Sequence, residues 1–284
     1  MKFVFIFFFI LSNVLYAQNL EPFQIYNKKG RKINVKRLMK QLESSEIILF
    51  GELHDNPIAH WLQLKTIQYL GEKSDLSLGA EMLETHMQKE LNAYLNNELT
   101  QEQLDTTIHL WTNYQTDYKP LVDYAKTNKI PFIATNIPRK YASFVYRNGF
   151  EALEAELSDA EKLLVAPLPI AYDPELPNYK AMLSMMSDHA NPNFPKAQAI
   201  KDATMAYFIY QEFQKNKNQF VHFNGDYHSK DFEGIYWYLR HLDKDVDIKT
   251  ISTVEQENID QLDDEFKGQA DFIIVVDADM TKTY

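Results

Sequence analysis

Short apolar runs alternate with longer amphipathic stretches along most of the chain. The short runs are rich in β-branched and aromatic side chains and are bounded by polar residues, Gly or Pro, a pattern typical of buried strands. Six such runs occur, at residues 47–50, 76–80, 130–134, 220–223, 246–251 and 272–276. Because helical patterns lie between most of them, the pattern predicts an α/β fold with a parallel or mixed sheet covered by helices.

The N-terminal residues have the layout of a secretory signal. Lys2 precedes an apolar run at residues 3–11, and a short segment then leads to Ala17. We expect a signal peptide at residues 1–17, because the run is far shorter than the roughly 20 residues that span a bilayer. The mature chain, residues 18–284, is expected to be exported to the periplasm or cell envelope, with no transmembrane span.

Residues 166–195 interrupt the alternation of strands and helices. More than half of the eleven prolines fall here, around one helical stretch at residues 178–189. Such punctuation marks an excursion from the sheet, and we expect residues 153–195 to form a small, mostly helical cap. One face of its helix carries Met182, Met185, Met186 and His189. This stripe fits either a packed core or a lid that faces a large flat ligand, since methionine adapts to irregular surfaces.

The composition excludes several classes of protein. A formal net charge of −11 leaves no basic excess for contacts with phosphates, so we expect no nucleic-acid binding. The chain has no cysteine, which excludes a thiol nucleophile, a thiolate ligand, a disulfide and a lipid anchor on cysteine. The glycines form no phosphate-binding loop and no serine lies in a nucleophile elbow, so nucleotide and serine-hydrolase chemistry have no support.

Polar residues follow four of the predicted strands at the point where each strand ends. Residues 51–54 read Gly-Glu-Leu-His and residues 225–228 read Gly-Asp-Tyr-His, so one pattern of glycine, acid and histidine occurs twice. Glu81 follows a third strand, and Asn136 and Arg139 follow a fourth. Since ligands bind outside the carboxyl ends of strands in open α/β sheets, we expect a crevice there. Its expected members are Glu52, His54, Glu81, Asp226 and His228.

Two kinds of chemistry fit these residues. In a metal hydrolase, a divalent ion such as Zn²⁺ or Mn²⁺ would be bound by His54, Glu81 and His228. Glu52 or Asp226 would then act as the catalytic base or orient a ligand. In a haem site, one or two axial donors would lie in an apolar pocket with cations near the propionates.

The haem alternative draws on the predicted cap. Its candidate axial donors are His189, Tyr179 and Tyr172. Asn136 and Arg139 are candidate contacts to the cofactor, with Arg139 meeting a propionate. Gln198 and Asp202 lie at i and i+4 of the next predicted helix, where they are either solvated or face the crevice.

Other polar residues have a structural explanation. Asn56 and Pro57 have the pattern of an N-cap and a first helical turn, so we expect Asp55 and Asn56 to serve the helix that follows. The remaining histidines have no comparable context and are expected to be structural. They are His60, His86, His109, His222 and His241.

Six stretches of the chain share their order and spacing with one known family. They are residues 48–57 (Ile-Leu-Phe-Gly-Glu-Leu-His-Asp-Asn-Pro) with Gln63, 79–82 (Gly-Ala-Glu-Met), 118–121 (Tyr-Lys-Pro-Leu), 134–139 (Ala-Thr-Asn-Ile-Pro-Arg), 197–206 and 225–228. With these motifs the chain resembles the ChaN-like haem-binding uptake proteins of the Tiki superfamily, also called iron-regulated proteins. The resemblance covers about residues 47–239.

The resemblance implies a Rossmann-like α/β domain with a small helical cap, haem bound between the two, and a role in iron acquisition at the cell envelope. Other branches of the superfamily are metal-dependent proteases that use two glycine-x-x-histidine motifs and a glutamate. These correspond here to residues 51–54, 225–228 and Glu81. Because the family pattern also includes Gln198 and Asp202, the resemblance implies that both face the crevice. The chain departs from the haem-uptake pattern because it lacks a lipid-anchoring cysteine and has Tyr227 where a small residue is expected.

Three hypotheses therefore stay open. The leading one is an exported protein that binds haem or another iron-containing small molecule during haem or iron uptake. The second is a metal-dependent hydrolase of the Tiki type, and the third is a binding module without activity that kept the fold. A homodimer is left open in each case.

Overall fold

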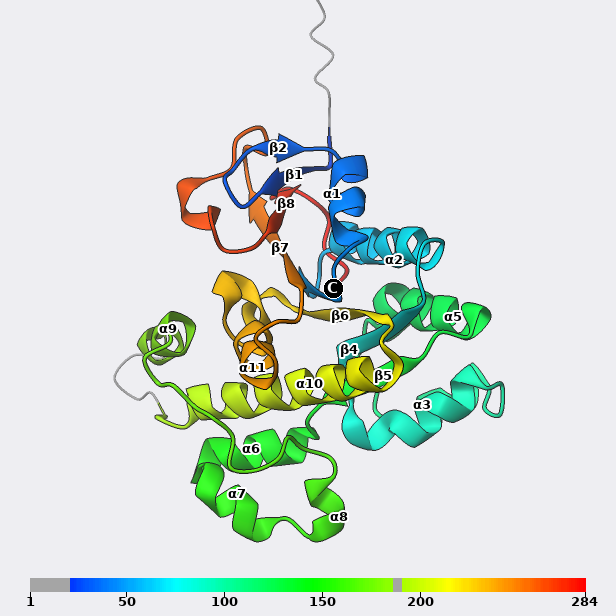
Figure 1. Cartoon of the computed structure of the whole chain (residues 1–284), viewed down its shortest axis with the longest axis vertical. Coiled ribbons are helices and arrows are strands. Elements are labelled where there is room, and N and C mark those ends of the chain that lie inside the picture. Colours follow the sequence, from blue (N-terminus) through cyan, green and yellow to red (C-terminus); the bar gives the residue numbers. More distant parts are fainter. Residues whose placement is uncertain (1–20, 186–190) are drawn as a thin grey trace, which may run out of the picture.

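The computed structural model describes residues 21–185 and 191–284 (Figure 1). The predicted signal peptide, Met186 and His189 lie outside these residues, as does the side chain of Met185. None of the helices in the two ranges is long and apolar enough to cross a membrane.

The strands of these ranges form one mixed sheet. They are β1 (Phe23–Asn27), β2 (Lys32–Ile33), β3 (Ile47–Glu52), β4 (Leu76–Glu84), β5 (Phe132–Asn136), β6 (Gln219–Gly225), β7 (Ile248–Gln256) and β8 (Phe272–Asp277). Their order in the sheet is β2-β1-β8-β7-β3-β6-β4-β5. Neighbours from β8 to β5 pair in parallel, whereas β1 pairs antiparallel with both β2 and β8.

The predicted α/β fold is confirmed, and all six predicted strands are present. The apolar pattern missed β1 and β2. In β1 only Ile25 and Tyr26 are buried, and β2 is two residues long, so neither strand produces an apolar run. Both therefore lie beyond what the pattern of the chain predicts.

Helices cover both faces of the sheet. They are α1 (Val35–Leu42), α2 (Pro57–Gly71), α3 (Gln88–Leu95), α4 (Gln101–Thr107), α5 (Lys119–Asn128), α6 (Arg139–Asn148), α7 (Phe150–Glu156), α8 (Asp159–Lys162), α9 (Pro177–Met185), α10 (Phe194–Asn216) and α11 (Ile235–Leu242). Residues of α1, α2, α3 and α5 pack on one face, and residues of α10 and α11 pack on the other.

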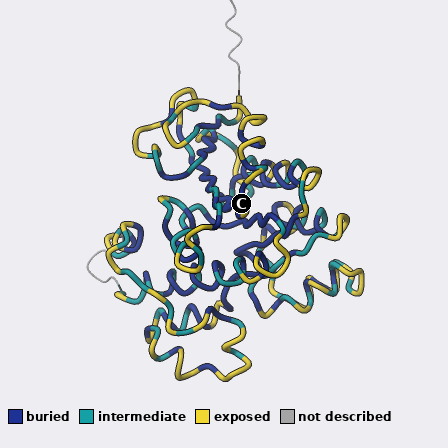
Figure 2. The backbone as a smooth tube through the Cα atoms, viewed as in Figure 1, coloured by how far each residue is buried: buried dark blue, intermediate teal, exposed yellow. Residues whose placement is uncertain are grey.

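The side chains of β3 show how one strand serves both layers. Ile48 and Phe50 belong to the core on the first face, and Ile47 and Leu49 belong to the core on the second. Successive side chains of a strand point to opposite faces, so a strand covered on both sides is apolar throughout. Figure 2 shows the strands buried and the outer sides of the helices exposed.

The predicted cap, residues 153–195, lies outside the sheet. Its described residues contain the end of α7, α8, α9 and the first residues of α10, with no helix between α8 and α9. Prolines in that interval remove backbone donors and break helical geometry. α6 and α7 pack on α10 in a small separate core, while Met182 of α9 is buried with Tyr179 against Ala199 of α10.

Candidate functional site

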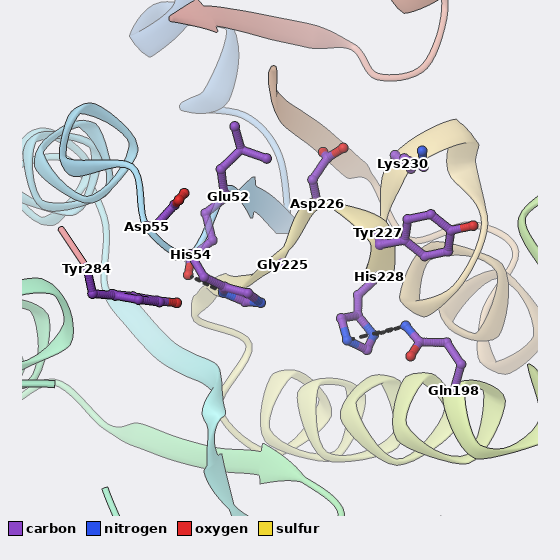
Figure 3. Close-up of a pocket in the computed structure, with 11 residues that line it drawn as sticks. Glu52, His54, Asp55, Gln198, Gly225, Asp226, Tyr227, His228, Lys230 and Tyr284 are labelled. Carbon is purple, nitrogen blue, oxygen red and sulfur yellow. Dashed lines mark hydrogen bonds and ion pairs between the residues drawn. The ribbon is translucent and has the colours of Figure 1, made fainter. Parts of the chain in front are cut away.

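Three neighbouring strands deliver the predicted residues to one edge of the sheet. β3 pairs with β6 so that Glu52 lies opposite Gly225, and β4 lies on the other side of β6. Glu81 of β4 accepts a hydrogen bond from the backbone N–H of Gly225, with 2.7 Å between N and Oε2. His54 follows β3 and His228 follows β6, so both imidazoles lie at the carboxyl ends of the strands (Figure 3).

Gly225 lets these segments approach each other closely. A Cβ atom at this position would lie 2.7 Å from Nε2 of His54 and 3.4 Å from Oε2 of Glu81. The first distance is shorter than a Cβ atom tolerates. The absence of a side chain at Gly225 therefore leaves room for the imidazole of His54.

The ring of His54 is oriented by Glu52. Nδ1 of His54 lies 2.9 Å from Oε1 of Glu52, whose side chain is fully buried. The same carboxylate accepts hydrogen bonds from the hydroxyl of Tyr118, 2.7 Å away, and from the side-chain amide of Gln63. Because a carboxylate only accepts, Nδ1 of His54 donates and Nε2 keeps the lone pair of the neutral ring. Within the described part of the chain, Nε2 has no hydrogen-bond partner.

Two effects oppose each other in setting the pKa of His54. Burial alone would lower this pKa, but the hydrogen bond to Glu52 and the nearby Glu81 carboxylate outweigh burial and raise it. The side chain is still about one-third exposed (32%). His54 is therefore an accessible imidazole that binds a proton more readily than a free histidine does.

Polar and aromatic groups support the loop that carries His54. The side-chain amide of Asn113 donates to the backbone oxygen of His54 at 3.1 Å, and Nε2 of His60 lies 3.0 Å from the same oxygen. The ring of Trp111 meets the His54 ring edge-on, with 5.0 Å between centroids. Asn56 caps α2 with its side chain, as predicted. The buried contacts of His60 fit the structural role predicted for it.

His228 lies between two buried carboxylates. Its Nδ1 is 2.5 Å from Oδ1 of Asp202 on α10, and its Nε2 is 3.1 Å from Oε1 of Glu81. The side-chain amide of Gln198, one turn before Asp202, lies 2.9 Å from Nδ1 of His228. The hydroxyl of Tyr179 donates to the other oxygen of Asp202 at 3.1 Å. Gln198 and Asp202 thus face His228, on the side of the helix predicted for them.

Glu81, His228 and Asp202 form a buried triad of titratable side chains, in which burial raises the pKa of Asp202. Burial alone would lower the pKa of His228, but Glu81 and Asp202 outweigh it and raise this pKa to about 9. Burial would raise the pKa of Glu81, but His228 and His54 hold it well below its usual range. Both nitrogens of the charged His228 ring donate to carboxylates, so neither has a free lone pair. The two histidines therefore differ in chemistry although their motifs are alike.

Asp226 points away from both histidines (Figure 3). Its Oδ1 is buried, has no hydrogen-bond partner in the described ranges, and would lie 2.7 Å from a Cβ atom built on Gly51. Burial raises the pKa of Asp226 to about 7. Asp226 thus lines the crevice, but its carboxyl group is turned away from the imidazoles.

Two pockets open at this edge of the sheet. The first has a volume of about 590 Å³, and its lining includes His54, Gly225, Tyr227, His228, Lys230 and Tyr284. The second has a volume of about 460 Å³, and its lining includes Glu81, Trp111, Asn113, Asn136, Arg139, Lys201 and Tyr284. His54 and His228 therefore belong to the first pocket, and Arg139, Lys201 and His109, for which the sequence predicted only a structural role, line the second.

Some of the predicted haem-binding residues line the second pocket, and others line neither pocket. Asn136 and Arg139 line the second pocket. Tyr179, Tyr172 and Met182 line neither pocket. Tyr179 is buried with its hydroxyl hydrogen-bonded, and Tyr172 stacks on it with 5.7 Å between ring centroids. These three side chains lie behind the crevice wall.

Several residues of the pockets were not predicted from the sequence. They are Trp111, Asn113, Lys201, Lys230 and Tyr284. No period or spacing in the chain signals Trp111, Asn113 and Tyr284, because each lies far from the two motifs in sequence. Lys230 lies two residues after His228, and Lys201 lies within the stretch 197–206 that carries the family resemblance. Gln63 and Tyr118, which bind Glu52, occur in the stretches that carry the family resemblance, and that was their only signal.

Potential metal ligands do not cluster as a metal site in the described residues. In residues 21–185 and 191–284 no group of three or more His, Cys, Asp or Glu side chains has an arrangement that could hold a metal ion. The role of His54, Glu81 and His228 as metal ligands stays a prediction.

Comparison with known families decides the membership of this chain. The family model for haem-binding uptake proteins of the Tiki superfamily, ChaN, matches residues 38–239. The chain belongs to this family. The resemblance found in the sequence is thereby confirmed, and the chain is a member of a haem-binding family.

Solved structures share the ChaN fold with this chain. One is ChaN of Campylobacter jejuni, described with cofacial haem binding, which superposes with a TM-score of 0.66 at 16% identity and covers 89% of this chain and 96% of its own. Another is a protein from Bacillus cereus, with a TM-score of 0.52 at 11% identity, covering 85% and 90% of the two chains. At these identities the likeness shows the fold alone.

A plant protein is related over part of the chain. Protein RETICULATA-RELATED 5, chloroplastic, of Arabidopsis thaliana is 28% identical over 140 residues, which cover 46% of this chain. The match spans only 18% of that relative's length.

Proposed function

We propose that this protein binds haem in the crevice at the carboxyl ends of β3, β4 and β6. We propose further that it is exported after cleavage at Ala17 and takes part in haem or iron uptake in the periplasm or cell envelope. Membership of a haem-binding family supports the first statement. The observation that carries it to this crevice is the His54 ring, which Glu52 orients so that an unengaged nitrogen faces a pocket of about 590 Å³.

His54 suits the iron of haem better than the other candidates. A ligand nitrogen needs a free lone pair, and a carboxylate on the opposite ring nitrogen fixes the tautomer and raises the basicity of the donor. His54 meets both conditions. Both nitrogens of His228 face carboxylates, and Tyr179 is held protonated because burial and Asp202 raise its pKa.

The side chains that line the two pockets suit the flat apolar ring of haem and its charged propionates. The rings of Trp111 and Tyr227 supply flat apolar surface, which a porphyrin requires. Cationic side chains line both pockets, with Lys230 in the first and Arg139 and Lys201 in the second. Carboxylate groups of the propionates would be held by these side chains.

Helix α9 is the part of the predicted cap that we assign to this site. The hydroxyl of Tyr227 donates to the backbone oxygen of Asn178 at 3.1 Å, and the N–H of Asn178 donates to Glu233 at 2.9 Å. These contacts hold the start of α9 beside the crevice. Met182 packs toward α10 rather than into either pocket, so it supports the wall without touching a ligand there.

Hemin titration of the mature chain tests the proposal. We expect a Soret shift that saturates, and in the variant His54→Ala a loss of affinity of about tenfold or more, equivalent to about 1.4 kcal/mol. His241→Ala is the matched control, because His241 is exposed on α11, and it should bind as the wild type does. Absence of any Soret shift in the wild type would end the proposal, and equal affinity in His54→Ala would remove His54 from it.

Three further measurements address the other parts of the proposal. N-terminal sequencing of protein recovered from the periplasm tests cleavage after Ala17. Elemental analysis tests the hydrolase alternative, which would require stoichiometric zinc or manganese. Sedimentation with and without hemin reports whether the protein is the homodimer that the sequence leaves open.

A further inference from the structure

We infer that Tyr284 divides the ligand crevice and has to swing aside before a flat ligand can reach from His54 to Arg139. The inference rests on the proposed function, because it names a segment that controls entry to that same site. It starts from one observation. Of the described residues that line the two pockets, Tyr284 alone is shared by both.

The ring of Tyr284 stands at the boundary between the pockets. Figure 3 shows it beside His54, with its hydroxyl directed toward the crevice. On the far side of that boundary, Trp111 touches the ring of His54 and lines the second pocket. His54 and Lys230 therefore lie on one side of Tyr284, and Arg139 and Lys201 lie on the other.

Residues 282–284 are fastened to the loop that carries His54. The backbone N–H of Thr283 donates to the backbone oxygen of Asp55 at 2.8 Å, and its hydroxyl lies 3.2 Å from the same oxygen. Nζ of Lys282 lies 3.6 Å from a carboxylate oxygen of Asp55 and also pairs with Glu255. Asp55 directly follows His54, so these contacts set the position of Tyr284 relative to the imidazole.

The contacts that hold residues 282–284 against the loop of His54 are weak enough to break easily. Lys282 and Asp55 are both about one-third exposed, and exposed ion pairs contribute little to stability. Tyr284 itself is 67% exposed, so its ring buries little apolar surface in the closed position. A ligand that fills both pockets needs only a modest advantage to displace the ring.

The charge around Tyr284 supports displacement rather than a role as iron donor. Burial of the hydroxyl and the neighbouring carboxylates of Asp55, Glu52 and Asp117 raise the pKa of Tyr284. The phenol therefore stays protonated at neutral pH, whereas an iron donor would be the phenolate. The ring acts as a neutral partition.

Access to His54 tests the inference without haem. Diethyl pyrocarbonate modifies the neutral Nε2 of histidine, and peptide mass mapping reports the rate at each site. We expect His54 to react several-fold faster in Tyr284→Ala and in Thr283→Pro, which lacks the N–H that donates to Asp55. Tyr284→Phe keeps the ring and should react at the wild-type rate. His86, exposed and outside both pockets, is the internal reference.

Stopped-flow mixing with hemin is the second readout. Association should be several-fold faster in Tyr284→Ala than in the wild type and unchanged in Tyr284→Phe. Equal reactivity of His54 in all four proteins, or weaker hemin binding in Tyr284→Ala, would overturn the inference. If the wild type does not bind hemin but His54 becomes more reactive in Tyr284→Ala, the proposed function fails while the partition stands.

Discussion

Nδ1 of His54 lies 2.9 Å from Oε1 of Glu52, and this contact decides which nitrogen of the ring faces the pocket. The carboxylate also accepts hydrogen bonds from the hydroxyl of Tyr118 and the side-chain amide of Gln63, so three donors hold it in place. A buried carboxylate that orients an imidazole raises its basicity and limits its motion. A buried carboxylate that also lines the first pocket therefore controls the orientation of His54.

Replacing Glu52 by Gln tests this control. An amide has one acceptor oxygen and presents an NH₂ group to donors that require an acceptor, so His54 loses its fixed orientation. We expect hemin affinity to fall by about 10- to 100-fold and the free energy of unfolding to fall by about 1–3 kcal/mol. Glu212→Gln, in a buried carboxylate outside both pockets, should affect stability alone. Wild-type hemin affinity in Glu52→Gln would contradict the prediction.

The triad of Glu81, His228 and Asp202 predicts a dependence of stability on pH. The pKa of His228 is raised from 6.5 to about 9 in the folded chain, so its contribution is complete below about pH 6.5 and is lost as the pH rises through 9. The pKa of Glu81 is lowered from 4.5, so its contribution is lost as the pH falls below about 4.5. The contributions of His228 and Glu81 are therefore both present between about pH 4.5 and pH 6.5, where this pair stabilises the fold most.

Comparison with Asp202→Asn isolates this effect. The variant removes one of the two carboxylates that face His228, while Glu81, Gln198 and the hydroxyl of Tyr179 remain. We expect it to be less stable than the wild type by about 3–5 kcal/mol near pH 6. The difference should shrink as the pH rises from 6.5 to 9, measured by urea denaturation. A difference that stays constant over this range would contradict a charged His228.

The strand ends illustrate what the sequence predicts well. Two apolar runs that each lead into glycine, an acid and a histidine are neighbours in the sheet, so His54 and His228 meet at one edge, as expected from parallel strands. Gln198 and Asp202, one helical turn apart, both contact His228, as the family resemblance implied. Periodic patterns carry this information because buried strands and helix faces repeat along the chain.

The directions of individual side chains do not follow from the motifs. Glu52 and Asp226 both come directly after the glycine of their motif, yet Glu52 ends β3 and binds His54, whereas Asp226 opens a short helical turn and faces Gly51. Tyr284 and Trp111 reach the crevice through tertiary contacts, which leave no periodic trace in the sequence. The fold was thus more predictable than the partners of each polar group.

Substitutions of two glycines in the sheet distinguish an effect on ligand binding from an effect on the stability of the fold. A Cβ atom at Gly225 would lie 2.7 Å from Nε2 of His54, a partly exposed ring that can move away. A Cβ atom at Gly79 would lie 2.8 Å from the ring of Phe220, which is fully buried. We expect Gly225→Ala to lower hemin affinity by about tenfold with a small loss of stability. Gly79→Ala should cost about 1–3 kcal/mol of stability and leave hemin affinity unchanged.

Hemin titration and chemical denaturation of both variants check this pair. The affinities are compared at equal folded fraction, so that a loss of stability is not counted as a loss of binding. An effect of Gly79→Ala on affinity as large as that of Gly225→Ala would mean that the crevice responds to any disturbance of the sheet, and the close approach of His54 to Gly225 would then have no special role.

The buried carboxyl group of Asp226 gives the last prediction. Burial raises its pKa from 3.8 to about 7, because removal from water disfavours the charged form more than the hydrogen bonds from Ser252 and Thr253 favour it. The unfolded chain therefore releases this proton at a lower pH than the folded chain. The contribution of Asp226 to stability is complete below about pH 3.8 and is lost as the pH rises through 7.

Asp226→Asn keeps the side chain neutral at every pH, so we expect it to be more stable than the wild type by about 1–4 kcal/mol at pH 8. The gain should be smaller at pH 5, because the wild-type carboxyl group is then mostly protonated in the folded chain. Urea denaturation at pH 5 and at pH 8 measures this gain in stability. The difference between the variant and the wild type cancels the titration of His228, which both proteins share. Glu257→Gln, at an exposed position, is the control. A variant less stable than the wild type at pH 8 would show that the carboxylate is charged and has a partner.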